Sequence, residues 1–299
     1  MNAISFPGGP RATGIVNGLS VDVEAWFQVG AFEDVIARDD WSGLTDRVDR
    51  NTREVLDLFD AADVKATFFT LGWVAKRHGA LMQDIVARGH ELASHGWDHA
   101  RVFTLDRKAF AKDLEISRKV LEDASGVSIS GYRAPSFSID HRTPWAYAEL
   151  AEQGYVYSSS VAPIAHDHYG WREAPRFAFK PLPWADIVEI PVTTAEFAGK
   201  RLAAGGGGFF RVLPYAFSRW AIRQVNTRDQ RPAVFYFHPW EIDPGQPRVA
   251  GARLKSRLRH YTNLDTMADK LRDVIAEFEW SRMDVIAHRE AQRVAAEAA

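Results

Sequence analysis

The feature that most constrains the fold is a regular alternation of short apolar runs with segments of helical periodicity. Runs rich in β-branched and aromatic residues predict buried strands at residues 19–24, 65–71, 91–95, 131–135, 155–160, 187–192 and 233–237. Apolar side chains at helical spacing predict helices at residues 46–61, 80–88, 106–124, 143–153 and 265–280. Strands that alternate with helices pair in parallel through right-handed crossovers. For a chain of 299 residues this α/β pattern favours an irregular (β/α) barrel over an open doubly wound sheet.

We expect a single domain, because no stretch rich in Pro, Gly or Ser divides the chain and no internal repeat occurs. The expected parts are a flexible N-terminal segment at 1–18, a barrel with loop insertions at 19–285, and a polar C-terminal tail at 286–299. The four glycines at 205–208 are not followed by Lys-Ser/Thr, so they predict a flexible turn and not a phosphate loop. Residues 163–183, with many aromatics and prolines, predict a long surface loop of the kind that lines binding sites.

No segment has the ~20 consecutive apolar residues that a membrane span requires. Residues 1–17 lack the apolar core of a signal peptide. We therefore expect a cytoplasmic protein without a membrane span.

The amino-acid composition excludes several kinds of site. The chain has no cysteine, which excludes disulfides, thiolate nucleophiles and Cys-ligated zinc, so any metal must be held by His, Asp or Glu. With 37 basic and 39 acidic residues the net charge is −2, which gives no case for a general nucleic-acid or anionic-membrane surface. The sequence leaves open whether the chain assembles with copies of itself.

Two polar motifs at the ends of predicted strands could hold a metal. Asp22 and Glu24 close the first strand, and their spacing of two points both side chains to the same face. His95 and His99 follow the third strand, and imidazoles four residues apart can converge on one ion. Two histidines and a carboxylate suffice for a catalytic divalent metal that keeps open positions. Taken alone, the acidic pair fits a structural role better and the two histidines are a weak signal, so the shared position at strand ends carries the hypothesis.

Two further motifs could assist chemistry at the same place. Arg133, in GYRAPSF, can hold a carboxylate through two hydrogen bonds. His238, in FYFHPWE, follows a hydrophobic strand and is suited to acid–base catalysis near neutral pH. His166 and His168 flank Asp167 in the long loop, but nothing ties them to a strand end, so we interpret them as loop residues.

The order of these motifs resembles the polysaccharide deacetylases of the NodB-homology type, which are metal-dependent carbohydrate esterases with a deformed (β/α) barrel. The resemblance runs from about residue 19 to 271. It rests on six phrases in order: SVDVEAWFQV, SHGWDH, GYRAPSFSI, GGGGFFRVLPY, FYFHPWEID and YTNLDTMADKL. These phrases are similar to the subgroup found with bacterial exopolysaccharide loci and the exosortase (PEP-CTERM) sorting system.

The resemblance implies a role for each motif. Asp22 matches the catalytic base, Arg133 the arginine paired with it, and His238 the general acid. His95 and His99 match the metal ligands, with zinc as the expected divalent ion. The common first motif has a ligating aspartate where this chain has Val23, so the resemblance implies Glu24 as the acidic ligand, with Asp22 as the alternative. Phe137 matches the residue whose backbone N–H stabilises the oxyanion. Three indoles are expected to contact substrate, those of Trp97, Trp184 and Trp240.

The implied reaction is removal of N-acetyl groups from a hexosamine-containing polysaccharide or its lipid-linked precursor. An N-acetylated glycan would be the substrate, and acetate and a free amino sugar would be the products. Two alternatives stay open: hydrolysis of another small or cyclic amide on the same barrel, and a metal-free glycan-binding relative. A glycosidase pair formed by Asp22 and Glu24 is disfavoured, because two acids on one strand do not flank a glycosidic bond at the separations that this chemistry needs.

Overall fold

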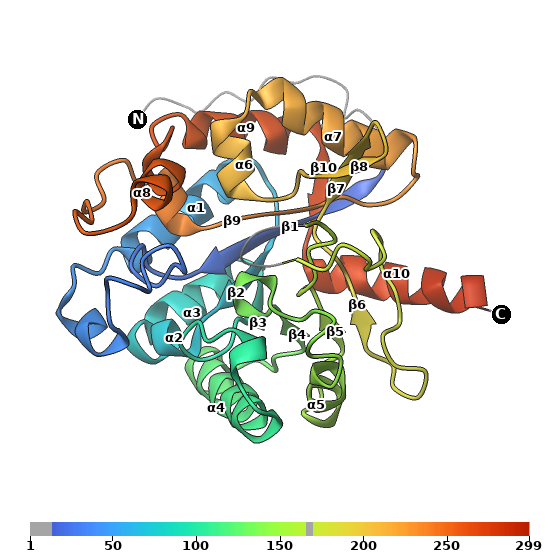
Figure 1. Cartoon of the computed structure of the whole chain (residues 1–299), viewed down its shortest axis with the longest axis horizontal. Helices are drawn as coiled ribbons and strands as arrows, with labels where there is room; N and C mark the ends of the chain where they lie inside the picture. Colours follow the sequence, from blue (N-terminus) through green and yellow to red (C-terminus); the bar gives the residue numbers. More distant parts are fainter. Residues whose placement is uncertain (1–13, 166–169, 299) are drawn as a thin grey trace.

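A computed structural model describes residues 14–165 and 170–298 of the chain, and its core is one curled sheet of parallel strands with helices packed around it (Figure 1). This is the irregular α/β barrel that the alternating pattern predicts. The strands of the sheet are β1 (Val16–Val23), β2 (Thr67–Thr70), β3 (Glu91–Ser94), β4 (Gly131–Tyr132), β5 (Tyr157–Ser158), β6 (Val188–Glu189), β9 (Val234–Phe237) and β10 (Glu279–Ser281). They follow the order β10-β1-β2-β3-β4-β5-β6, with β9 also paired to β1.

The predicted helices lie at α1 (Val48–Ala61), α3 (Gly79–Ala87), α4 (Arg107–Ser125), α5 (Ala146–Glu152) and α9 (Met267–Glu277). The ends of α4 have clear local causes. The Asp106 carboxylate accepts a hydrogen bond from the Ala109 N–H at 2.7 Å, and Gly126 ends the helix in the left-handed conformation. The structure adds helices that the pattern did not predict: α2 (Gly72–Arg77), α6 (Gly207–Val212), α7 (Tyr215–Thr227), α8 (Leu254–Tyr261) and α10 (Met283–Ala298).

Strand β1 is the centre of the sheet. Its outer residue Val16 is half-buried and the seven that follow are buried. It pairs with β2 along one side, and with β10 and then β9 along the other. Because all of these strands run in parallel, their carboxyl ends open at the same edge of the sheet. Polar residues at those ends are therefore brought together by the topology.

The barrel is closed between β6 and β9 by irregular backbone contacts. The Thr193 N–H donates to the Val234 carbonyl oxygen at 3.3 Å, and the Tyr236 N–H donates to the Gly205 carbonyl oxygen at 2.8 Å. A Cβ atom on Gly205 would lie 2.4 Å from the Val234 carbonyl oxygen. The expectation of a flexible turn at 205–208 is therefore wrong, because this segment packs against β9 and its last two glycines open α6.

Both ends of the chain differ from the expected boundaries. Strand β1 already begins at Val16, inside the N-terminal segment that was expected to be flexible. Residues 286–298 are not a polar tail, because they belong to α10, where Ile286 and Ala287 are buried. Trp280 lies in β10 and not in the preceding helix, which ends at Glu277.

The expected long loop is largely present. Outside an isolated bridge from Phe179 to Glu189, the described part of residues 163–183 forms no strand or helix. His166 and His168 lie outside the described residues. Among the helices of the described residues, none combines the length and the apolar composition that a bilayer crossing requires.

Candidate active site

The four polar motifs converge at the carboxyl end of the sheet. Glu24 follows β1, His95 follows β3, Arg133 follows β4 and His238 follows β9. Arg133 reaches Asp22 on β1, and both His99 and His238 lie within 3.5 Å of Glu24. The parallel sheet thus brings together residues that are separated by more than two hundred positions in the chain.

Three of these residues form a cluster that could hold a metal ion. Glu24, His95 and His99 each offer one ligand atom, and these atoms lie within 4.8 Å of one another. The Glu24 Oε2 atom is 3.0 Å from His99 Nε2, yet it is buried and accepts no hydrogen bond within the described part of the chain. His95 donates from Nδ1 to the Arg133 carbonyl oxygen at 2.8 Å, which leaves its Nε2 atom as the ligand.

The electrostatics of the cluster fit a cation. Burial lowers the pKa of His95 to about 4 and the pKa of His99 well below its usual value, so both imidazoles are neutral, as metal ligands must be. Burial also raises the pKa of Glu24 to about 7, because the nearby His238 supplies too little positive charge to offset the cost of burying the carboxylate. A divalent cation would supply that charge and would satisfy the orphaned Oε2 atom.

Asp22 has a different environment, which separates it from the cluster. Its Oδ1 atom accepts a hydrogen bond from Arg133 Nη1 at 2.6 Å, and both side chains are almost fully buried. Arg133 also donates to the hydroxyl oxygens of Ser20 and Ser159 at 2.8 and 3.0 Å, and its guanidinium lies 4.1 Å from the centre of the Phe69 ring. The guanidinium is therefore fixed on several sides, and it holds the Asp22 carboxylate in place.

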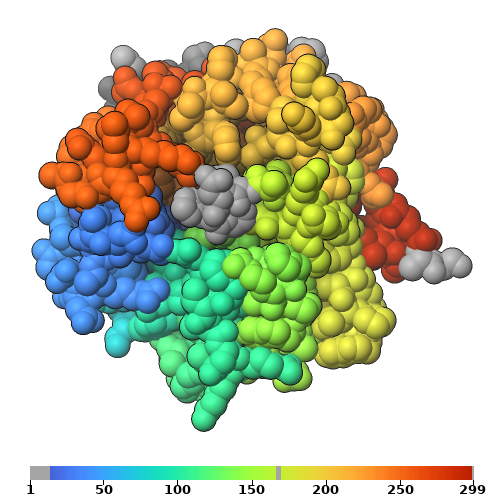
Figure 2. Space-filling model, in the orientation of Figure 1, coloured from blue at the N-terminus to red at the C-terminus, as the bar shows by residue number. Residues whose placement is uncertain are grey.

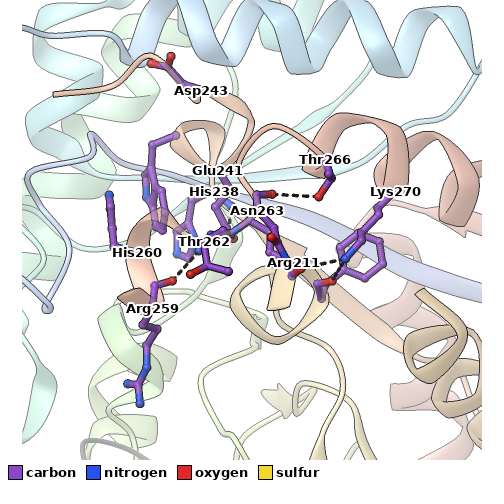
Figure 3. A network of polar contacts seen from close by, with 12 residues as sticks. Arg211, His238, Glu241, Asp243, Arg259, His260, Thr262, Asn263, Thr266 and Lys270 are labelled. Atoms are coloured by element: carbon purple, nitrogen blue, oxygen red, sulfur yellow. Dashed lines mark hydrogen bonds and ion pairs between the residues drawn. The ribbon is translucent and has the colours of Figure 1, made fainter. Parts of the chain in front are cut away.

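His238 is held by Glu241, which Arg211 holds in turn, and neither residue was predicted from the sequence (Figure 3). Glu241 accepts a hydrogen bond from His238 Nδ1 at 2.8 Å, and the Nε2 atom of the same ring lies 3.5 Å from Glu24 Oε1. Arg211, from α6, donates to the other oxygen of Glu241 at 2.6 Å. Burial alone would lower the pKa of His238, but Glu24 and Glu241 outweigh it and raise this pKa to about 9. The sequence offers one signal for this contact, because in FYFHPWE the acid Glu241 lies three residues after His238.

The three tryptophans that were expected to contact substrate differ in how far they are exposed. Trp240 is 6% exposed, stacks with the imidazoles of both His238 and His260, and donates from Nε1 to Glu24 at 3.3 Å. Little of the Trp240 ring is exposed, and its contact with substrate stays a prediction. Trp97 is half-buried, whereas Trp184 is 64% exposed.

The Phe137 N–H has a backbone partner in this structure. It donates to the Ala134 carbonyl oxygen at 3.0 Å within a short 3-10 turn, η3 (Pro135–Phe137). The assignment of this N–H to the oxyanion stays a prediction. Ser136 and Phe137 both have positive φ angles, of 55° and 50°, which side chains other than glycine adopt rarely and at a cost.

Comparison with known families identifies the region that carries His95, His99 and Arg133. Residues 37–156 match the family model described as polysaccharide deacetylase. This region of the chain is therefore similar to the polysaccharide deacetylase family. Residues 159–288 match a second model, described as a domain of unknown function (DUF3473). This second region supplies Arg211, His238 and Glu241, while Asp22 and Glu24 precede both matches.

Among curated relatives, the chitooligosaccharide deacetylase of Sinorhizobium fredii is 36% identical over 103 residues, covering 33% of this chain and 48% of the relative. Chitin deacetylase 1 of Cryptococcus neoformans is 26% identical over 105 residues, covering 35% and 22%. The chain thus spans less than half the length of these relatives.

Two solved structures share the fold over nearly the whole chain. A candidate polysaccharide deacetylase from Mycobacterium smegmatis has a TM-score of 0.61 at 19% identity, covering 99% of this chain and 96% of that one. Puue allantoinase also has a TM-score of 0.61, at 13% identity, covering 95% and 93%. At these identities the similarity concerns the fold alone.

Proposed function

We propose that this protein is a metal-dependent hydrolase that removes acetyl groups from acetamido sugars of a polysaccharide, with a role in exopolysaccharide biosynthesis. The observation that carries the proposal is the joint geometry of three groups. The Asp22–Arg133 pair lies beside the Glu24–His95–His99 cluster, and His238 lies 3.5 Å from Glu24. The matched family and the names of the curated relatives support a glycan as the substrate.

In this proposal Glu24, His95 and His99 hold a divalent cation, which we expect to be zinc because two imidazoles and one carboxylate are a common catalytic zinc set. When bound, the ion supplies a Lewis acid that polarises the amide carbonyl and makes water a better nucleophile. The carbonyl oxygen of Arg133 holds His95 from behind and fixes which of its nitrogens faces the cation.

The side chains around this cluster would move the protons of an amide hydrolysis. Asp22, held by Arg133, takes a proton from the attacking water. His238 gives a proton from Nε2 to the departing amine, while Glu241 keeps the other ring proton on Nδ1. This division needs no covalent nucleophile, in agreement with the lack of cysteine.

The direct test is acetate release from N-acetylated oligosaccharides by the purified chain loaded with zinc. Asp22→Asn and His238→Ala should each lower kcat by about 10²-fold or more while the fold is retained. His288→Ala, an exposed histidine on α10, is a matched control that should keep full activity. Equal activity of the Asp22 variant and the wild type would contradict the proposal.

A cyclic amide is the second candidate substrate, because the allantoinase structure matches this fold as well as the deacetylase structure does. The same assay with allantoin in place of the glycan separates the two. Turnover of allantoin with no acetate release from any acetylated glycan would replace the deacetylase proposal by this one.

A further inference from the structure

Helix α8 carries its apolar residues on the outside. In the sequence LKSRLRHY only His260 is buried, whereas Leu254 is 69% exposed and Leu258 is 59% exposed. The two leucines are four residues apart and therefore lie on one face of the helix. Val35, which is 43% exposed, lies next to the segment that leads into α8, 3.9 Å from the position a Cβ on Gly251 would take. Leucines are normally the residues that a surface helix turns inward, so this inversion requires an explanation.

The same segment is strongly basic. Residues 248–261 contain five basic side chains and no acidic one, although the whole chain has a net charge of −2. These side chains are all exposed: Arg248, Arg253, Lys255, Arg257 and Arg259. Within the described residues, Asp34 from outside the segment pairs with Arg253 at 2.9 Å. The near-neutral total charge thus conceals a local positive patch around two exposed leucines.

The patch borders the candidate active site. His260, the buried residue of α8, stacks on Trp240 with ring centres 4.1 Å apart, and Trp240 in turn stacks on His238 at 5.0 Å. Arg211, which holds Glu241, also donates to the Arg259 carbonyl oxygen at 3.1 Å. Figure 3 shows Arg259 and His260 on the same side of this network as His238. The inner face of α8 is therefore anchored to the site, and its outer face forms part of the molecular surface.

The space-filling view supports this arrangement. Figure 2 shows the orange segment that includes α8 at the outer edge of the molecule, directly above the blue segment that precedes α1. The Arg253–Asp34 ion pair joins these two segments. Leu254, Leu258 and Val35 therefore belong to one region of the surface, and we call this region, with its five basic residues, the α8 patch.

We propose that the α8 patch docks the protein on an anionic phospholipid surface, so that the site acts on a glycan carried by a membrane lipid. Exposed leucines flanked by Lys and Arg are the composition of helices that lie in the membrane interface, where apolar side chains enter the acyl boundary and basic ones attract acidic headgroups. The substrate part of this inference rests on the proposed deacetylase function, whereas the docking itself does not. A soluble polyanion would match the charges but would leave the leucines without a purpose.

Sedimentation with lipid vesicles tests the docking. The full-length protein is mixed with vesicles of phosphatidylcholine alone or of equal parts phosphatidylcholine and phosphatidylglycerol. We expect binding to the anionic vesicles only, weakened by salt. Arg257→Gln with Arg259→Gln should lower binding by about 25-fold, at about fivefold per charge. Leu254→Ser with Leu258→Ser should lower it by at least about tenfold.

Matched controls remove similar groups elsewhere. Lys112→Gln with Lys119→Gln takes two exposed charges from α4, and Val127→Ser with Val156→Ser takes two exposed apolar side chains. Both controls should bind vesicles like the wild type. All four double variants should release acetate from a soluble acetylated oligosaccharide at the wild-type rate, because none of these residues lies in the catalytic cluster.

Three outcomes would overturn the proposal: equal binding to neutral and anionic vesicles, no binding to either, or α8 variants that bind like the wild type. Binding to heparin without binding to anionic vesicles would instead make the patch a site for soluble polyanions. If the vesicle results are as expected but no acetate is released from any soluble substrate, the docking surface stands and the deacetylase function fails.

Discussion

Arg211 and Glu241 form an ion pair at 2.6 Å in which both side chains are almost completely buried. A buried pair of this kind costs desolvation energy that its mutual attraction only partly returns, so its presence suggests a purpose other than stability. Burial opposes ionisation of Glu241, but Arg211 and His238 outweigh it and lower the pKa of this carboxyl group to about 2. A permanently charged carboxylate keeps the proton of His238 on Nδ1 and so fixes the orientation of the ring.

The first prediction concerns Glu241 as a positioning residue. Glu241→Gln should lower kcat for acetate release by about 10²-fold with little change in KM, because His238 loses its fixed tautomer while the substrate keeps its contacts. Glu290→Gln is a matched control, since Glu290 is also a buried acid near arginines but lies on α10. If the Glu241 variant loses stability but keeps kcat, the residue has a structural role only and the prediction is wrong.

The second prediction concerns the acidic metal ligand. Glu24→Gln, His95→Ala and His99→Ala should each lower zinc affinity by more than the ~10–100-fold that loss of an outer-shell partner costs. Asp22→Asn should still bind zinc, because the Asp22 carboxylate is engaged by Arg133 and lies outside the cluster. Metal content after dialysis, and the rise in Tm on adding zinc, measure both effects. Full zinc content in the Glu24 variant, with loss in the Asp22 variant, would reverse the assignment.

Local patterns in the sequence were enough to predict the barrel, and they singled out Asp22, Glu24, His95, His99, Arg133 and His238 as candidates for one site. The strands that precede Glu24 and His95 are short apolar runs, and a parallel sheet gathers the polar residues that follow its strands. Asp22 and Glu24 could not be told apart from sequence, because both lie on one face of the same strand. Only the position of Arg133, which reaches Asp22, separates their environments.

Features that depend on contacts far apart in the chain were not predictable in this way. The glycines before α6 resemble a flexible turn, and only the approach of β9 explains why side chains are excluded there. Arg211 lies thirty positions from Glu241, so neither residue alone indicates a pair. Helix α8 has no inward apolar face, and its one buried side chain is the imidazole of His260.

The third prediction concerns pH and a buried acid at the start of β3, away from the candidate site. Glu91 accepts hydrogen bonds from the Tyr157 hydroxyl at 2.8 Å and from the Asp284 N–H at 3.0 Å, and so ties α10 to the sheet. Burial, together with the nearby Asp284 carboxylate, raises the pKa of Glu91 from 4.5 to about 7. The folded state therefore binds this proton more tightly than the unfolded state.

The sign of the effect follows from that difference. The stability contributed by protonated Glu91 is fully present below about pH 4.5 and is lost as pH rises through 7, by about 3 kcal/mol in total. Glu91→Gln cannot ionise, so its Tm should rise relative to the wild type between pH 5 and pH 8, on the order of several degrees. Glu115→Gln, at an exposed position on α4, should show no such trend. Parallel Tm curves for the Glu91 variant and the wild type would contradict the prediction.

The last prediction uses two neighbouring glycines in α6. A Cβ on Gly207 would lie 2.3 Å from Glu241 Oε1 and 2.8 Å from the Phe237 Cβ atom. Glu241 Oε1 is the oxygen that accepts the hydrogen bond from His238 Nδ1. Gly207→Ala should therefore displace Glu241, lower stability by about 1–3 kcal/mol and reduce kcat for acetate release. At Gly208 a Cβ would meet nothing within 4 Å. Gly208→Ala should keep kcat and add up to about 1 kcal/mol of stability, because alanine loses less conformational entropy in a helix. Denaturant unfolding and steady-state kinetics on the two variants measure both effects, and equal behaviour would mean that α6 does not set the position of Glu241.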